Sequence, residues 1–312
     1  MSVPRLRLGT RASPLARWQA EWVAGQLSQR GVEVELVPIS TQGDVKTGPL
    51  GQIGGQGLFT KEIQRALLER KIDVAVHSLK DLPTAEVDGL TIAAVPRRES
   101  TADVLVSKVA DSLEKLPHGS RVGTGSLRRK AQLLHVRPDL AVLEIRGNVD
   151  TRLRKLDEGE YDAIVLAEAG LRRLGLAERA TFVLPRSIML PAVGQGALAI
   201  ETRSGDAVSQ SLVEPLDDAA THAAVLAERS MLAALRGGCL APVGGLARVE
   251  GPVLTLEGVV LSGDGQRKIS AAAAARSEDA VRIGQQVADE LLVQGASDLI
   301  AASREATGPR FE

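Results

Sequence analysis

Arginines stand beside tight turns at three places where a helix is expected to begin. The segments are Thr10-Arg-Ala-Ser13, Gly123-Thr-Gly-Ser-Leu-Arg-Arg129 and Arg146-Gly-Asn-Val-Asp-Thr-Arg152. The start of a helix offers free backbone N–H groups and the positive end of its dipole, and arginine adds a fork of donors. Three such segments indicate a ligand with several carboxylates or phosphates. For any one segment, a capped helix with exposed arginines is the competing interpretation.

These residues alone leave the identity of the anionic groups open. The sequence contains no Gly-x-x-x-x-Gly-Lys-Ser/Thr loop, which disfavours nucleoside triphosphate chemistry of that class. The segment after Gly123 resembles a dinucleotide fingerprint only superficially, because Arg128 stands where the third glycine would be. A recognisable acidic cluster for a metal is also missing from the sequence, which disfavours a phosphate-transferring enzyme.

Asp81 is the candidate catalytic carboxylate. It follows Lys80 in the segment Val76-His-Ser-Leu-Lys-Asp-Leu-Pro83, where a buried strand is expected to end in a polar turn. A carboxylate beside a cation stays ionised and can stabilise a developing positive charge or move a proton. The competing interpretation is a surface turn in which Asp81 caps backbone N–H groups. His77 by itself is more typical of a structural histidine than of a base.

Cys239 is the only cysteine, so an internal disulfide and a thiolate zinc site are excluded. The four histidines show no metal-ligand spacing, and we expect no metal. A lone cysteine is usually a small buried hydrophobic residue. Here it follows two glycines in Arg236-Gly-Gly-Cys239, where the missing side chains let another group approach the sulfur. Cys239 is therefore a candidate nucleophile or attachment point.

Composition narrows the classes of partner. The chain has 38 Lys and Arg against 39 Asp and Glu, and aromatic residues make up 2% of it. We expect no nucleic-acid partner, because both a basic field and stacking rings are lacking. The longest apolar runs are far shorter than a membrane span, and no basic segment leads into an apolar run at the N-terminus. We therefore expect a cytoplasmic protein without a membrane partner.

Strand-like and helix-like runs alternate through the first two hundred residues, a pattern typical of parallel sheets covered by helices. This α/β pattern places the candidate residues after strands, at the sheet edge where ligands bind. Glycines between 41 and 57 predict a long loop of the kind that covers sites. Strands are expected at 5–9, 32–40, 73–77, 91–95, 104–107, 121–123, 141–145 and 163–167, and helices at 14–30, 58–70, 126–135, 149–158 and 169–174.

The sequence changes character at about residue 218. An Ala-rich helix to 235, three strand-like runs at 243–249, 253–261 and 268–275, and a helix at 278–294 predict a small α+β domain. The glycine-rich segment 191–201 turns into a strand that could return to the first α/β unit. With 312 residues the chain exceeds one ordinary core. We predict three domains, at 1–96 with 194–215, at 97–193 and at 216–312.

Seven motifs, taken together and in order, resemble the porphobilinogen deaminase family, also called the hydroxymethylbilane synthases. Each is weak alone, but together they are specific and span nearly the whole chain. They are Gly9-Thr-Arg-Ala-Ser-Pro-Leu-Ala16, Gly57-Leu-Phe-Thr-Lys-Glu62, Val76-His-Ser-Leu-Lys-Asp-Leu-Pro83, Gly123-Thr-Gly-Ser-Leu-Arg-Arg129, Arg146-Gly-Asn-Val-Asp-Thr-Arg152, Gly194-Gln-Gly-Ala197 and Gly237-Gly-Cys239.

The resemblance implies a fold class, namely two α/β domains like those of type II periplasmic binding proteins and a C-terminal α+β domain with a three-stranded antiparallel sheet. It implies a transferase that joins four porphobilinogen molecules head to tail, with loss of ammonia, into hydroxymethylbilane, the linear tetrapyrrole of haem and chlorophyll biosynthesis. The implied primer is a dipyrromethane cofactor held covalently by Cys239 through a thioether bond. The family-based expectation is a monomer.

The same resemblance assigns roles to individual residues. Asp81 matches the family's catalytic aspartate, which would bind pyrrole N–H groups and stabilise the cation left when ammonia departs. Arginines would bind the acetate and propionate groups of the substrate. The residues assigned to the cofactor are Cys239, Lys80, Asp81, Thr124, Ser126, Arg128, Arg129, Arg146, Gly147 and Gly196. Those assigned to the substrate are Arg11, Ser13, Phe59, Asn148, Arg152 and Gln195.

Some positions depart from the family pattern. Gln42, Gln56 and the pair Thr101-Ala102 stand where relatives often have a basic residue, so some contacts to the growing chain should differ. The competing hypothesis is a solute-binding protein of the same architecture, whose arginines hold an organic anion without reaction. Such a protein needs neither an attachment sulfur nor a carboxylate facing an anionic ligand, so Cys239 and Asp81 discriminate between the two.

Overall fold

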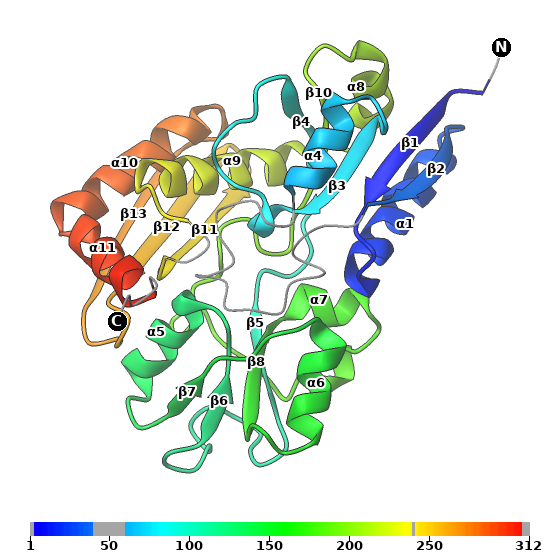
Figure 1. The fold of residues 1–312 in the computed structure, drawn as a ribbon. Helices are drawn as coiled ribbons and strands as arrows, with labels where there is room; N and C mark the ends of the chain where they lie inside the picture. Colours follow the sequence, from blue (N-terminus) through cyan, green and yellow to red (C-terminus); the bar gives the residue numbers. More distant parts are fainter. Residues whose placement is uncertain (1–2, 40–59, 239–240, 308–312) are drawn as a thin grey trace. The chain divides into compact units, whose positions relative to one another are not determined.

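The computed structural model describes residues 3–39, 60–238 and 241–307 (Figure 1). These residues form two compact units. Unit 1 contains residues 3–39, 60–98 and 197–223, and unit 2 contains residues 99–196 and the described residues from 224 to 307. The three-domain division with boundaries near 96, 193 and 215 stays a prediction.

Unit 1 is built on a five-stranded sheet in the order β2-β1-β3-β10-β4. The sheet is mixed rather than parallel, because β10 runs antiparallel to both its neighbours. Strand β10 comes from a distant part of the chain, and the alternation of elements does not reveal its direction. The strands are β1 (Arg5–Thr10), β2 (Glu33–Pro38), β3 (Val74–Ser78), β4 (Leu90–Ala94) and β10 (Leu198–Arg203); the helices are α1 (Pro14–Ser28), α4 (Lys61–Leu68), α8 (Ala207–Val213) and the short turns η1 (Leu79–Asp81) and η3 (Glu214–Leu216).

Helices cover both faces of this sheet. Ser13 caps α1, since its Oγ accepts a hydrogen bond from the Ala16 N–H at 3.4 Å, and a proline occupies the first turn. Successive residues of β3 point to opposite faces, so Val74 and Val76 pack with α1 while Ala75 packs with α4. Because β3 is buried on both faces, the polar residues Lys80 and Asp81 come only after the strand has ended.

Unit 2 contains a second five-stranded sheet, in the order β7-β6-β8-β5-β9. Strand β6 is parallel to β7 and β8, and β5 is antiparallel to β8 and β9. This sheet is also mixed. The strands are β5 (Asp103–Ser107), β6 (Arg121–Gly123), β7 (Ala141–Leu143), β8 (Ala163–Ala167) and β9 (Phe182–Val183); the helices are α5 (Leu127–Val136), α6 (Val149–Asp157), α7 (Glu168–Arg173) and the turn η2 (Ala177–Arg179).

A three-stranded antiparallel sheet, β11-β12-β13, completes unit 2. Helix α10 packs closely on it, because a Cβ on Gly258 of β12 would lie 3.1 Å from both Leu291 and Val287. Glycine at this position permits the close approach of helix and sheet. The strands are β11 (Val243–Glu250), β12 (Val253–Leu261) and β13 (Lys268–Arg276); the helices are α9 (Ala219–Ala234), which begins in unit 1, α10 (Ala280–Val293), α11 (Ala296–Thr307) and the turn η4 (Ser277–Asp279).

The architecture expected from the sequence is confirmed, with two α/β sheets and a C-terminal three-stranded antiparallel sheet. Most expected elements are present with ends shifted by a few residues. Strand β9 and helices α8 and α11 are additional to the prediction. In the part of the chain that the structure describes, no helix combines the length and the apolar character needed to cross a membrane.

Candidate active site

In unit 1 the predicted ligand-binding residues follow two neighbouring parallel strands, β1 and β3. The carboxyl ends of parallel strands lie at the same edge of a sheet, which is where ligands bind in α/β folds. Arg11 and Ser13 follow β1, while Lys80 and Asp81 follow β3. The structure therefore brings these four residues to one edge of the unit 1 sheet.

Asp81 ends the turn η1, which is tied to β10 by the Leu79 N–H donating to the Ala197 carbonyl at 3.0 Å. Asp81 is exposed and Lys80 is half-buried. Among the described residues, the Asp81 carboxylate has no hydrogen-bond or ion-pair partner, and Lys80 does not pair with it as the sequence suggested. The carboxylate is thus held on a fixed turn and is available to a ligand.

His77 is a structural histidine. Its Nε2 lies 3.0 Å from Glu201 Oε2, and the Gln64 amide donates to Glu201 Oε1 at 3.0 Å. All three residues are buried. These hydrogen bonds link β3, β10 and α4 close to the turn η1, which begins two residues after His77 and carries Asp81.

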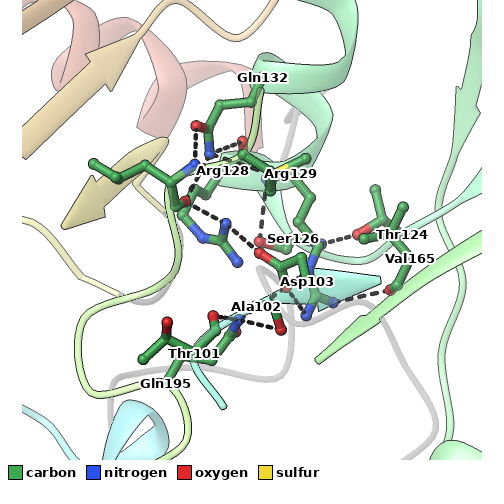
Figure 2. A network of polar contacts seen from close by, with 12 residues as sticks. Thr101, Ala102, Asp103, Thr124, Ser126, Arg128, Arg129, Gln132, Val165 and Gln195 are labelled. Atoms are coloured by element: carbon green, nitrogen blue, oxygen red, sulfur yellow. Dashed lines mark hydrogen bonds and ion pairs between the residues drawn. The ribbon is translucent and has the colours of Figure 1, made fainter. Parts of the chain in front are cut away.

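In unit 2, residues following the parallel strands β6 and β7 also gather at one sheet edge. Ser126 is the N-cap of α5, and its Oγ accepts from the Arg129 N–H at 3.5 Å (Figure 2). Thr124 Oγ1 accepts from the Ser126 N–H at 3.2 Å. Both hydroxyls build the start of α5 and thereby position the arginines of its first turn.

Both of these arginines point toward the buried carboxylate of Asp103 (Figure 2). Arg128 Nη1 donates to Oδ2 at 2.8 Å, and Arg129 Nε and Nη2 donate to Oδ1 at 2.9 and 2.7 Å. The side chains of Arg128, Arg129 and Asp103 are 4%, 7% and 0% exposed. Desolvation favours a raised pKa for Asp103, but attraction to the two guanidinium groups outweighs it and holds the pKa well below its usual range.

Acid should remove the stabilisation that Asp103 supplies. Because its pKa is lower in the folded than in the unfolded chain, its contribution is complete above the unfolded pKa of about 3.9 and is lost as the pH falls further. Asp103→Asn leaves two buried cations uncompensated and should lower the free energy of unfolding by about 3 to 5 kcal/mol at pH 7. Denaturant unfolding should be measured in steps from pH 7 to below 4. The difference in unfolding free energy between the wild type and the variant should shrink as the pH falls below about 4. A constant difference would contradict this ion pair.

Asp103 is absent from the residues predicted for the site. It opens β5, and since β5 is antiparallel to β8, it lies at the same edge as the residues that follow β6 and β8. The available signal was an acidic residue before the apolar run Val104-Leu-Val106. The pairing with arginines 25 and 26 residues away depends on the direction of β5, which the sequence does not reveal.

Gln195 is fully buried and its amide holds neighbouring chain segments. Its Nε2 donates to the Thr101 carbonyl at 2.8 Å and to Asp103 Oδ1 at 3.0 Å (Figure 2). Gly196, the next residue, has φ 86°, and its carbonyl accepts from Arg173 Nη2 at 2.7 Å. Contact between Gln195 and substrate stays a prediction, whereas its bond to Asp103 is a feature of the fold.

One fully buried nitrogen of this cluster has no hydrogen-bond partner among the described residues. Arg128 Nε is buried and has no hydrogen-bond partner within the described chain, while Nη1 also donates to the Leu190 carbonyl at 2.7 Å. Desolvation accordingly lowers the pKa of Arg128, against the pull of Asp103. A buried donor beside a net positive charge fits a carboxylate. The residues present therefore fit one acidic arm of a dipyrromethane.

The residues after β7 are more exposed. Arg146 Nε donates to the Glu144 carboxylate at 2.7 Å, and Arg152 Nε donates to the Gly147 carbonyl at 2.8 Å. Gly147 has φ 108°, which glycine adopts without strain, and the exposed Asn148 precedes α6 without capping it through its side chain. A ligand carboxylate would have to compete with Glu144 for Arg146.

Cys239, Phe59, Gln42 and Gln56 lie outside the described residues. Within the described ranges, no group of three His, Cys, Asp or Glu side chains could hold a metal ion.

Comparison with known proteins gives a consistent assignment. The family model described as "Porphobilinogen deaminase, dipyromethane cofactor binding domain" matches residues 6–211, and "Porphobilinogen deaminase, C-terminal domain" matches residues 222–293. The porphobilinogen deaminase of Acidithiobacillus ferrooxidans (strain ATCC 53993 / BNL-5-31) is 51% identical over 304 residues, covering 96% of this chain and 99% of that protein. The porphobilinogen deaminase of Syntrophotalea carbinolica is 50% identical, covering 97% of each.

Among solved structures, a putative methionine-binding lipoprotein from Bacillus subtilis aligns with 68% of this chain and 89% of its own, at 13% identity and a TM-score of 0.43. That likeness is too remote to bear on function. The two family models cover most of the sequence, and they include Asp81, the Asp103 cluster and the motifs that suggested the same assignment. The chain belongs to the porphobilinogen deaminase family.

Proposed function

We propose that this chain polymerises four porphobilinogen molecules head to tail, releasing ammonia, to give hydroxymethylbilane in tetrapyrrole biosynthesis. The observation that carries the proposal is the buried, net-positive cluster at the start of α5, which lies within the segment matching a dipyrromethane cofactor binding domain. Porphobilinogen bears acetate and propionate groups, and such a cluster suits their charge.

Asp81 is the catalytic residue of the proposal. Its carboxylate is exposed on a fixed turn and has no partner in the described chain. It would accept hydrogen bonds from pyrrole N–H groups and stabilise the positive charge that develops on the substrate as the C–N bond to ammonia breaks. A well-placed group of this kind contributes about 3 to 4 kcal/mol to the transition state.

The cationic residues bind carboxylates in this proposal. Lys80 and Arg11 lie at the same sheet edge as Asp81 in unit 1. Arg128 offers the unused donor in unit 2, and Arg146 and Arg152 lie on the more exposed segment after β7. The backbone N–H groups at the start of α6 would add further donors.

Cys239 would hold the dipyrromethane through a thioether bond. When bound, this group supplies the free pyrrole carbon to which the first substrate unit is joined. The carboxylate-binding residues of the chain orient it and neutralise its acidic arms. We also propose that the protein acts as a cytoplasmic monomer without a membrane partner. Its balanced charge of 38 basic and 39 acidic residues supports the further proposal that it has no nucleic-acid partner.

Intact mass spectrometry under denaturing conditions tests this function, because only covalently attached groups survive them. Protein from cells able to make porphobilinogen should exceed the sequence mass by one dipyrromethane. Cys239→Ser should show the mass of the bare polypeptide and should release no hydroxymethylbilane, because serine is a far weaker nucleophile than a thiolate.

One outcome of the mass measurement would contradict the proposal. If the wild-type chain from such cells shows only the polypeptide mass, covalent attachment is wrong. A solute-binding role would then predict reversible binding of porphobilinogen without turnover, measurable by calorimetry on the same sample.

A further inference from the structure

The two arginines of the α5 cluster use their donors differently. All three nitrogens of Arg129 are engaged, since Nε and Nη2 bond Asp103 and Nη1 donates to the Val165 carbonyl at 3.0 Å. In Arg128 only Nη1 is engaged, with Asp103 and the Leu190 carbonyl, and Nε has no partner in the described chain. Every nitrogen of Arg129 therefore has a protein partner, whereas Nε of Arg128 is left for a ligand.

The net charge of the cluster also indicates that it binds an anionic group of a ligand. Two guanidinium groups and one carboxylate leave a single net positive charge in a site that is almost fully buried. One further carboxylate would neutralise it, and a second would introduce an uncompensated buried charge. The cluster is matched to one acidic arm of a ligand.

Asp103 is itself held by a second set of contacts. Gln195 Nε2 donates to Asp103 Oδ1 at 3.0 Å and to the Thr101 carbonyl at 2.8 Å (Figure 2). The segment that carries Gln195 is anchored by Glu228 of α9, whose buried carboxylate accepts from the Gly194 N–H at 2.7 Å and the Ala247 N–H at 2.8 Å. Each contact restrains the position of the carboxylate that the arginines share.

The geometry points to Asp103 as a positioning residue that acts through Arg128. It binds Arg129 through Nε and Nη2, holds Arg128 by Nη1 alone, and so directs the remaining donors of Arg128 to one ligand carboxylate. Gln195 supports Asp103 in this task. The inference rests on the proposed function, because the carboxylate belongs to the dipyrromethane or to porphobilinogen.

Steady-state kinetics and covalent loading test this role. Asp103→Asn should raise the KM for porphobilinogen about tenfold, as expected for the loss of one well-oriented charged hydrogen bond, and should lower the loaded fraction of the purified chain. The kcat per loaded chain should change less than threefold. In a background of Arg128→Gln, Asp103→Asn should raise KM no further, because the residue through which it acts is gone.

A matched control separates positioning from stability. Asp162 also pairs with an arginine and a backbone N–H in unit 2, through Arg121, so Asp162→Asn should lower the unfolding midpoint without changing KM or loading. If Asp103→Asn does not fold, Gln195→Met removes the amide support without changing charge and should raise KM several-fold. Unchanged KM and loading in a folded variant would overturn the inference. A wild-type chain without dipyrromethane would instead refute the proposed function.

Discussion

Asp81→Asn is expected to lower kcat per loaded chain by about 10²- to 10³-fold, the effect of removing one electrostatic group from a transition state. The amide keeps the shape of the carboxylate but cannot offset a positive charge on the substrate. Because Asp81 is exposed and has no partner among the described residues, the fold should not depend on its charge. Rates should be measured as hydroxymethylbilane formed per chain that carries the covalent group.

Asp88→Asn provides the matched control. Asp88 is an exposed aspartate shortly after Asp81 in the same connection between β3 and β4. Its amide variant should keep the wild-type kcat and the wild-type unfolding midpoint. A normal rate for Asp81→Asn would show that the catalytic carboxylate has been misassigned.

The sequence could predict which residues reach the sheet edges, because the signals are local. A strand followed at once by a glycine or serine turn and a helix places residues such as Arg128 and Asp81 at the carboxyl end of that strand. The N-cap at Ser13 and the strand at Arg121–Gly123 were visible for the same reason. Both features depend on residues close together in the sequence, and both are present in the structure.

The sequence could not predict which of these residues also form hydrogen bonds within the protein. Arg129 is predicted to bind the cofactor, and the structure shows that it also donates to Asp103 and to the Val165 carbonyl, a pairing that the sequence does not reveal. The direction of β5 decides that pairing, just as the direction of β10 decides that the first sheet is mixed. Contacts of this kind join distant segments, so no local pattern reports them.

Gly196→Ala should be among the most destabilising single substitutions in the chain. Gly196 has φ 86°, and a Cβ there would lie 2.4 Å from the Glu99 carbonyl oxygen and 2.6 Å from that of Ser100. The left-handed backbone costs an alanine about 1 to 2 kcal/mol, and contact with backbone that cannot move aside adds about 1 to 3 kcal/mol. Urea unfolding should therefore show a loss of about 2 to 5 kcal/mol.

Gly31→Ala separates the two causes, because Gly31 has φ 81° but a Cβ added there would meet no atom within 4 Å among the described residues. It should lose only the backbone part, about 1 to 2 kcal/mol. Equal losses in the two variants would mean that the Glu99–Ser100 segment yields to the new methyl group. Since that segment leads directly into Asp103, any folded Gly196→Ala protein should also show a raised KM for porphobilinogen, which Gly31→Ala should not.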